Sequence, residues 1–435
     1  MEALPVVVVG GSLAGMAAAA RLAKAGHRVR LVERTDRLGG RWAGADLAGH
    51  PGVRVDAMPG VLTFPAPWRD LFKKSGRAFD AELARAGLEL VPGPPATHRF
   101  PDGLELQLPA ERAAQHAALT AALGRPAAER WRDLLDRLLG VWQQLRPLGM
   151  ELELLSQRQL TPDVRRTLLL DRTVADLADD LAEPHLGAVV RAVVQRAGSD
   201  PERTPAFRAA ELVATRTFGR WVLHDRDGAP QPVHRLVELV ADRLRLRKVA
   251  LDLGRTVTAL TTRPRPRVEV DGEPVDAAAV VSAVDPWTHL RLDPRGLRWA
   301  DRRRLARARP ALAPAVSHAV VEDDPVPGGV AELVEHRLDG PVVRYRRALG
   351  ERTLVSTHDS TAASPDPSYG IAWDGPASWW RMPPVSTGRP LLWTAGPHSR
   401  GGSSLSQVLL SGALASYACH DALSGVPAAP VRRVR

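Results

Sequence analysis

Residues 6–42 constrain the fold of this chain more than any other segment. A short apolar strand is predicted over Val6–Val9, a helix of small residues over 16–25 and a second strand over Val29–Val32, with the acid Glu33 at its tip. A glycine-rich turn joins the first strand to the helix. Because strand, helix and strand in this order form a βαβ unit, the sequence predicts an α/β fold built on a parallel sheet.

The glycine turn follows the pattern G-x-G-x-x-G in outline, the fingerprint of a dinucleotide site. The first glycine permits a tight turn, the last lets helix and strand approach closely, and the helix N-terminus offers N–H groups to a pyrophosphate. Ser12 stands where the pattern has its middle glycine. An ordinary glycine turn at the start of a parallel sheet is the alternative. The residues predicted to bind the pyrophosphate are Gly10, Gly11, Ser12, Leu13, Ala14 and Gly15.

The acid after the second strand indicates which nucleotide is bound. Glu33 lies 18 residues after Gly15, where its carboxylate can accept hydrogen bonds from the hydroxyls of an adenosine ribose and would repel a 2′-phosphate. The segment from Glu33 to Arg41 reads E-R-x-D-R-x-G-G-R and resembles the extended motif of FAD enzymes in the amine oxidase and phytoene desaturase superfamily. The resemblance implies an FAD cofactor held in part by Arg34, Gly39, Gly40 and Arg41. A plain surface turn is the alternative for the glycine pair.

Residues 391–416 resemble the C-terminal flavin motif of the same superfamily, with a strand, Ala-Gly, a glycine-rich turn and a helix. Ser403 or Ser404 can cap a helix that begins near Leu405, and its first N–H groups would face the N1/O2 edge of the flavin. A strand, turn and helix that only close the sheet are the alternative. The residues that the resemblance assigns to the cofactor here are Gly396, Ser406 and Gln407.

His398 is the one candidate for acid–base chemistry near this motif. It follows Pro397 at a place where many relatives have an acid after Ala-Gly. The histidine could accept a proton, or it could hold ribityl or phosphate oxygens of the cofactor. Catalysis in the resembling family is mainly that of the flavin, whose N5 accepts a hydride, so no other catalytic residue is named.

The middle of the chain resembles the phytoene desaturase branch, through segments 55–72 and 100–108 and a Trp- and Leu-rich helix over 127–145. In relatives, the position of Val257 contacts adenine through its backbone. The resemblance implies a three-layer, Rossmann-like FAD-binding domain interleaved with an α+β substrate domain. The expected FAD-binding segments are 1–58, 220–285 and 388–425, the substrate segments are 59–219 and 286–387, and 426–435 is a tail.

Within the substrate segments, residues 331–346 and 353–357 alternate like strands, whereas the Ser/Thr/Pro-rich stretch 359–367 is expected to be a loop. Three tryptophans precede the C-terminal motif and are expected to wall an apolar substrate pocket: Trp373, Trp379 and Trp380.

The resemblance implies an oxidoreductase that binds FAD noncovalently and desaturates an apolar, isoprenoid or polyene-like substrate. Two alternatives remain open. A flavin amine oxidase would need an aromatic cage and a lysine near flavin N5, yet only four of the 59 basic residues are lysines. A flavoprotein without redox turnover, acting as an isomerase or lipid-binding protein, would explain the departures at Ser12 and Pro397.

Composition limits the partners. The net charge of +10 does not predict nucleic-acid binding, because no nucleic-acid module is recognisable and acids lie close to most arginines. The segment 67–77 combines Trp68, Leu71 and Phe72 with basic residues, so it is either a membrane-surface helix or a helix packed on its own domain.

No metal site is expected, since Cys419 is the only cysteine and no H-E-x-x-H motif occurs. The uncharged stretch 3–20 is explained as strand and glycine turn, so we expect a cytoplasmic protein, peripheral to the membrane if the segment 67–77 binds lipid. The sequence leaves the oligomeric state open.

Overall fold

A five-stranded parallel sheet forms around the first strand of the chain. The structure is a computed structural model that describes residues 3–322 and 324–426. Alternate valines of the first strand face opposite sides of this sheet, so both faces are buried. The strands, in spatial order, are β10 (Ala250–Leu253), β2 (Val29–Glu33), β1 (Val6–Val9), β14 (Ala279–Ser282) and β19 (Leu392–Thr394).

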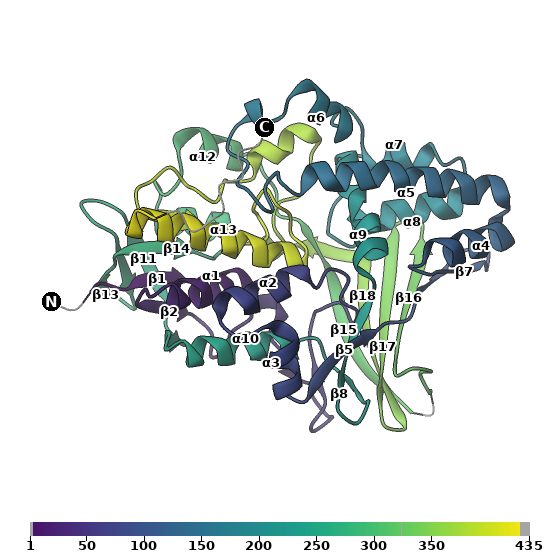
Figure 1. Cartoon of the computed structure of the whole chain (residues 1–435), viewed down its shortest axis with the longest axis horizontal. Coiled ribbons are helices and arrows are strands. Elements are labelled where there is room, and N and C mark those ends of the chain that lie inside the picture. The colour runs from purple at the N-terminus through teal and green to yellow at the C-terminus, as the bar shows by residue number, and fades with distance from the viewer. Residues whose placement is uncertain (1–2, 323, 427–435) are drawn as a thin grey trace.

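Helices cover one face of the parallel sheet and a small antiparallel sheet covers the other (Figure 1). Val6 and Val8 pack against the helices α1 (Leu13–Lys24), α10 (Arg235–Leu246) and α13 (Leu405–Ser424). On the other face, Val7 and Val9 pack against β11 (Val257–Thr261), β12 (Arg267–Val270) and β13 (Glu273–Asp276). This arrangement confirms the predicted three-layer α/β fold.

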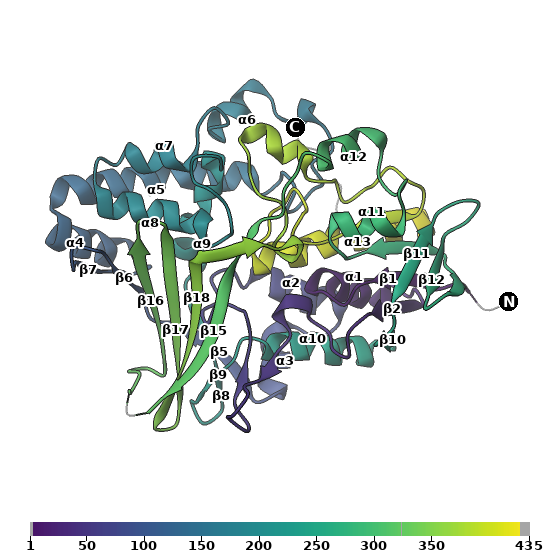
Figure 2. The ribbon, with the colours of Figure 1, turned by 180° about the vertical axis from the view of Figure 1, so that it is seen from behind.

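A second, six-stranded sheet stands beside the first (Figure 2). Its pairings are antiparallel except for that between β16 and β6. Alternate residues of the four longest strands face the interior, which makes this sheet the floor of a cavity. In spatial order the strands are β15 (Leu312–Val321), β18 (Arg352–Pro365), β17 (Gly340–Leu349), β16 (Val330–Arg337), β6 (Ala96–Arg99) and β7 (Glu105–Leu108).

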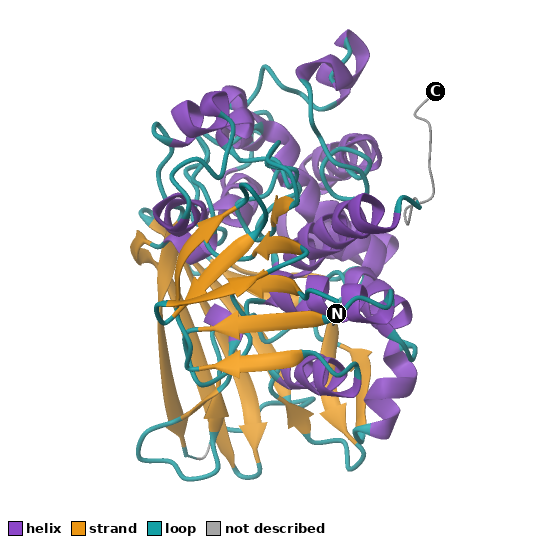
Figure 3. Cartoon of the chain, turned by 90° about the vertical axis from the view of Figure 1, so that its left-hand side faces the viewer, coloured by secondary structure: helices purple, strands orange, loops and turns teal. Residues whose placement is uncertain are grey.

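A helical layer packs on one end of the six-stranded sheet and forms a second hydrophobic core. Figure 3 shows most strands gathered on one side of the molecule and most helices on the other. The expected helix over 127–145 lies within α5. The helices of this part are α4 (Arg112–Leu123), α5 (Arg125–Leu145), α6 (Pro162–Thr167), α7 (Val174–Asp179), α8 (Pro184–Gln195) and α9 (Glu211–Phe218), with short 3-10 turns at Gln157–Gln159 and Ala206–Ala210. The helices α11 (Pro286–Leu292) and α12 (Trp299–Leu305) lie on the side of the parallel sheet, and two further 3-10 turns are Pro367–Tyr369 and Pro376–Arg381.

Several elements cross the domain division expected from the sequence. The helices α2 (Ala66–Ser75) and α3 (Phe79–Arg85) lie in an expected substrate segment but pack into the core of the parallel sheet. A small sheet joins β5 (Leu88–Pro92) to β8 (Trp221–Asp225) and β9 (Pro230–Gln231), and so links the two expected domains. The remaining elements are β3 (Ala45–Asp46), β4 (Arg54–Val55) and the 3-10 turn Gly40–Trp42. The residues of the expected tail beyond 426 lie outside the described part.

The loop expected over residues 359–367 is wrong. The strand β18 continues to Pro365, with Asp359 opposite Ala315 and, after a shift in register, Ser364 and Pro365 opposite Ala313 and Leu312 of β15. Threonine is compatible with a pleated strand, and the proline stands at the strand end, where a missing N–H is tolerated.

Helix α2 resolves the two alternatives for the segment 67–77. Its apolar residues Trp68, Leu71 and Phe72 are buried against the core of the parallel sheet, while Lys73 and Lys74 are exposed. The segment is therefore a helix packed on its own domain, and its apolar side is not free to enter a bilayer. Within residues 3–322 and 324–426, no helix is long and apolar enough to cross a membrane.

Candidate functional site

The glycine turn between β1 and α1 leaves no room for side chains at its two ends. Gly10 has a φ of +100°, and a Cβ on Gly15 would lie only 2.1 Å from the carbonyl oxygen of Gly10. Ser12 has an ordinary φ of −63°, and its Oγ donates to the carbonyl of Ala283 at 3.0 Å. Serine therefore fits the position of the middle glycine, because the backbone there needs no glycine and the side chain is bonded to the neighbouring strand end.

Glu33 lies at the tip of β2, beside the turn. Its Oε2 accepts a hydrogen bond from Gly11 N at 2.7 Å, and its Oε1 accepts from Thr35 N at 2.9 Å. The N–H of Arg255 donates to the Glu33 carbonyl, which brings the segment before Val257 to the same edge of the sheet. The residues expected at the adenosine end are thus close to one another.

The glycine pair before Arg41 runs alongside the glycine turn. Gly39 N donates to Gly11 O at 2.8 Å, and both Gly39 and Gly40 have positive φ values, of +112° and +59°. This close approach explains why the motif has two glycines, since a Cβ on Gly39 would meet a valine of α10 at 2.7 Å. Arg34 of the same motif is exposed.

Arg41 is a half-buried cation with spare hydrogen-bonding capacity. Its guanidinium lies 4.1 Å from the Trp42 ring centroid and 3.9 Å from that of Tyr369, and its Nη2 donates to Ser403 O at 3.2 Å. Burial lowers the pKa of Arg41 to about 10, so the group stays charged at neutral pH. Its Nη1 is buried without a partner among the described residues, which suits an oxygen of a bound molecule.

The start of α13 has the capped geometry expected from the sequence. Ser404 is the N-cap, and Gln407 Oε1 accepts from Ser404 N at 3.2 Å. Ser406 Oγ donates to Phe64 O at 2.6 Å. Since the Gln407 N–H also donates to the Ser404 side chain in this capping box, Ser406 is the one of the two that would contact a cofactor through its backbone N–H.

His398 lies in the glycine-rich turn before α13, next to Gly396. Gly396 has a φ of +152°, and its N–H donates to Ser411 Oγ at 2.9 Å. Burial lowers the pKa of His398 to about 4, so this histidine is neutral at physiological pH. Its Nδ1 is buried and has no partner among the described residues. The ring therefore offers a free donor or acceptor to a bound molecule.

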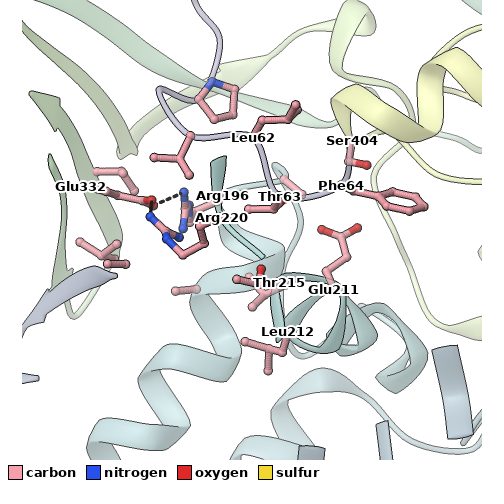
Figure 4. Close-up of a pocket in the computed structure, with 18 of the residues that line it drawn as sticks. Leu62, Thr63, Phe64, Arg196, Glu211, Leu212, Thr215, Arg220, Glu332 and Ser404 are labelled. Carbon is pink, nitrogen blue, oxygen red and sulfur yellow. Dashed lines mark hydrogen bonds and ion pairs between the residues drawn. The ribbon is translucent and has the colours of Figure 1, made fainter. Parts of the chain in front are cut away.

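A cavity of about 330 Å³ begins at Arg41, Tyr369 and the start of α13 and extends between the loop 57–64 and the six-stranded sheet. Figure 4 shows part of it, with Phe64 and Ser404 on one side and Leu212 of α9 below. Most of the wall is apolar, and its large apolar side chains include Leu62, Phe64, Trp131, Leu135 and Leu212.

One wall of the cavity is charged, which the sequence analysis missed. Arg196 donates to Glu332 Oε1 at 2.7 Å and to the Tyr345 hydroxyl at 2.6 Å, and Arg220 donates to the other oxygen of Glu332. Figure 4 shows both arginines converging on this carboxylate. We call Arg196, Arg220, Glu332 and Tyr345 the floor cluster. A signal was present in the sequence, because Glu332 alternates with the buried valines of its strand, on their side of the sheet.

Electrostatics keep the floor cluster charged. Burial by itself would raise the pKa of Glu332, but Arg220 and Arg196 outweigh it and lower that pKa to about 2. Burial raises the pKa of Tyr345 to about 12. The neighbouring His98 and His358 are neutral, because burial lowers their pKa values to about 3 and about 4.

The three tryptophans expected as pocket walls are not among the residues that line this cavity. Trp379 is buried against Phe207, and its Nε1 donates to Arg400 O. Trp373 also packs on Phe207 and borders a small side cavity near Pro397. Trp380 faces a separate outer hollow lined by arginines. Packing within the helical core explains their positions.

Comparisons with known proteins agree with this geometry. The chain is similar to phytoene dehydrogenase from Streptomyces griseus, with 34% identity over 298 residues that cover 66% of this chain and 55% of that protein. It is also similar to hydroxyneurosporene desaturase from Cereibacter sphaeroides, with 35% identity over 164 residues, or 37% of this chain and 30% of the relative. The chain thus spans about half, or less, of the length of these relatives.

Solved structures share the fold at low sequence identity. Putrescine oxidase bound to putrescine has a TM-score of 0.66 at 16% identity, covering 97% of this chain and 99% of that one. Cyclohexylamine oxidase from Brevibacterium oxydans IH-35A has a TM-score of 0.63 at 17% identity, covering 97% and 100%.

The family model described as flavin containing amine oxidoreductase matches residues 13–416, and membership of it implies a flavin cofactor. The match runs from the glycine turn through the cavity-lining segments to α13. The chain belongs to the family of flavin containing amine oxidoreductases.

Proposed function

We propose that this protein is an FAD-dependent oxidoreductase that dehydrogenates a long, mainly apolar substrate to form a carbon–carbon double bond. The observation that carries the proposal is the cavity, which is walled mostly by apolar side chains and begins beside Arg41 and the start of α13. The likeness to phytoene and hydroxyneurosporene desaturases supports a polyene-like substrate.

The residues at the edge of the parallel sheet fit FAD held without a covalent bond. Glu33 would bind the ribose, the turn at Gly10 and Gly15 the pyrophosphate, and Arg41 an oxygen of the cofactor through its unpartnered Nη1. Cys419, the only cysteine, is fully buried on α13, and burial raises the pKa of its thiol to about 12. An unionised thiol is a poor nucleophile, which argues against attachment of the flavin to it.

The bound FAD would supply the hydride acceptor, and the protein supplies position and a dry environment. Apolar walls such as Leu62, Leu135 and Leu212 exclude water from the substrate chain. The N–H groups at the start of α13 would stabilise negative charge on the cofactor. We assign His398 to holding the cofactor, because it does not line the cavity.

Amine oxidation is the second candidate, since the structural neighbours include amine oxidases. At 16–17% identity these neighbours support a shared fold and do not indicate a shared substrate. The two aromatic faces that could cage an amine, Trp42 and Tyr369, already enclose the guanidinium of Arg41. All four lysines of the chain are exposed, so none can stand near a buried flavin ring. These contacts favour dehydrogenation of an apolar chain.

We place the protein in the cytoplasm, with an apolar small molecule as its partner. Contact with a membrane, if the substrate comes from one, would use a surface other than the buried side of α2.

The proposal is tested by cofactor release and product analysis. Acid precipitation of the purified yellow protein should release a flavin that co-migrates with FAD rather than FMN. Incubation with linear isoprenoid hydrocarbons should then give a product that mass spectrometry finds lighter by two hydrogen atoms. A protein that remains colourless after reconstitution with FAD would overturn the proposal, and products from amines alone would favour the second candidate.

A further inference from the structure

The floor cluster carries one more positive charge than negative. Two guanidinium groups, Arg196 and Arg220, share the single carboxylate of Glu332. The histidines beside them, His98 and His358, are neutral, and Tyr345 is protonated at physiological pH. Of the other charged side chains that line the cavity, Glu211 pairs with Arg208 and Arg216 with Asp136, while Arg41 lies at the end next to α13. The end of the cavity against the six-stranded sheet therefore contains one uncompensated cation.

Arg196 is the member of the cluster that is open to the cavity. Its side chain keeps 34% of its surface accessible, compared with 9% for Arg220 and 2% for Glu332. Both hydrogen bonds of Arg196 start from Nη2, so Nε and Nη1 have no partner in the part of the chain that the structure describes. Because Arg196 lines the cavity, these donors are available to a molecule inside it.

A second unpartnered polar atom borders the same cavity. His358 of β18 also lines the cavity, and its ring meets that of Tyr345 edge-on with 5.2 Å between the ring centroids. The Nε2 of His358 is buried and has no partner among the described residues. Buried polar groups and buried charges are normally paired, and leaving them unpaired is unfavourable. A hydrocarbon filling this end of the cavity would leave both sites unsatisfied and the extra cation without a counter-charge.

We propose that the substrate of this enzyme ends in an oxygen-bearing group that accepts hydrogen bonds from Arg196, and that a carboxylate fits best because it neutralises the extra charge. This inference rests on the proposed function and names its substrate class, an apolar chain with one polar end. The apolar walls bind the chain, and Arg196 fixes which end lies against the six-stranded sheet.

The test compares three ligands that share one polyene chain and differ at its end: retinoic acid, retinol and the matching hydrocarbon. Their dissociation constants for the FAD-loaded protein would be measured at neutral pH by quenching of tryptophan fluorescence. The acid should bind at least about tenfold more tightly than the hydrocarbon, as a charge-assisted hydrogen bond implies.

Three variants separate recognition from structure. Arg196→Met should reduce the ratio of the dissociation constants of the hydrocarbon and the acid towards one. Because Glu332 keeps Arg220 as its partner, this variant is expected to fold. Arg196→Lys retains the charge and should restore part of the preference. The control is Arg191→Met, on the same helix, because Arg191 pairs with Asp179 and does not line the cavity; it should keep the full preference.

Each result is decisive. Tighter binding of the acid alone supports a carboxylate, and equally tight binding of retinol supports a neutral oxygen group. Equal affinity for acid and hydrocarbon in the wild type, or an unchanged preference in Arg196→Met, overturns the inference while leaving the proposed function intact. Failure of all three ligands to bind the FAD-loaded protein would instead count against the apolar-substrate function itself.

Discussion

The glycine turn and the floor cluster are built in opposite ways. The turn and its acid lie within 24 residues, from Gly10 to Glu33, and depend on the absence of side-chain volume. The floor cluster takes residues from the C-cap of α8, from the segment before β8, and from β16 and β17, and depends on the balance of charges there. The glycine turn is therefore determined by local steric constraints, and the floor cluster by electrostatic contacts between residues far apart in the sequence.

The difference separates the proposed cofactor site from the proposed substrate site. The backbone geometry of the turn leaves little choice of residue at Gly10 and Gly15. The cluster lines the proposed substrate cavity, and nothing in the backbone requires charge there.

The largest effect is expected from Glu332→Gln. The substitution leaves the buried Arg220 and the more accessible Arg196 without a counter-charge, and breaking a buried pair such as Arg220–Glu332 typically costs about 3–5 kcal/mol of unfolding free energy. Denaturant titration measures the loss. The control Glu105→Gln breaks an exposed pair with Arg99 and should change stability by less than about 1 kcal/mol. Equal losses in the two variants would show that the floor cluster is not an electrostatic unit.

The same pair predicts an acid-sensitive part of the stability. The pKa of Glu332 is about 2 in the folded protein, below its ordinary value of 4.5. Its contribution is therefore complete above pH 4.5 and is lost as the pH falls from 4.5 towards 2. Unfolding free energies measured across this window should fall less steeply in Glu332→Gln than in the wild type. Parallel profiles would contradict the assignment.

A smaller effect, on the cofactor, is expected from Glu33→Gln. The amide loses charge-assisted hydrogen bonds to the ribose, which corresponds to about 1.5–3 kcal/mol, or roughly ten- to a hundredfold in FAD affinity. Titration of the apo-protein with FAD measures it. The control Asp36→Asn removes an exposed acid from the same loop and should leave the affinity unchanged. Unchanged affinity in Glu33→Gln would mean that the ribose lies elsewhere.

Gly15→Ala tests the steric character of the turn. The new Cβ would collide with the carbonyl of Gly10, so we expect a loss of about 1–3 kcal/mol in stability together with reduced FAD content. Gly140→Ala is the matched control, because Gly140 lies in α5 with nothing near its Cβ position. That variant should gain about 0.5–1 kcal/mol. A gain of stability in both variants, or a loss in both, would contradict the steric explanation.

The parts that the sequence predicted well are those in which neighbouring residues decide the structure. The glycine turn, the helix start at Leu405 and the alternating strand β16 all follow from short-range patterns. The loop expected at 359–367 failed because pairing with a distant strand outweighed a turn-like composition. The tryptophans at 373–380 could not be placed, since the helical core that surrounds them comes from other parts of the chain.

The partners of Glu332 in the floor cluster lay beyond the sequence for the same reason. Arg196, Arg220 and Tyr345 belong to segments that look ordinary when read alone, and only the fold brings them to one carboxylate. Among 55 arginines, nothing local distinguishes two that are buried in a cavity wall from those that pair at the surface.

The most direct test of the proposed dehydrogenation of an apolar chain is anaerobic reduction of the bound flavin. FAD-loaded protein would be mixed with a linear isoprenoid, as the hydrocarbon and as the carboxylic acid, and in parallel with putrescine, while the visible flavin absorbance is followed. If the protein dehydrogenates apolar chains, the isoprenoid should bleach the flavin absorbance and the diamine should leave it unchanged. Bleaching by putrescine with none by either isoprenoid would contradict the proposed dehydrogenation.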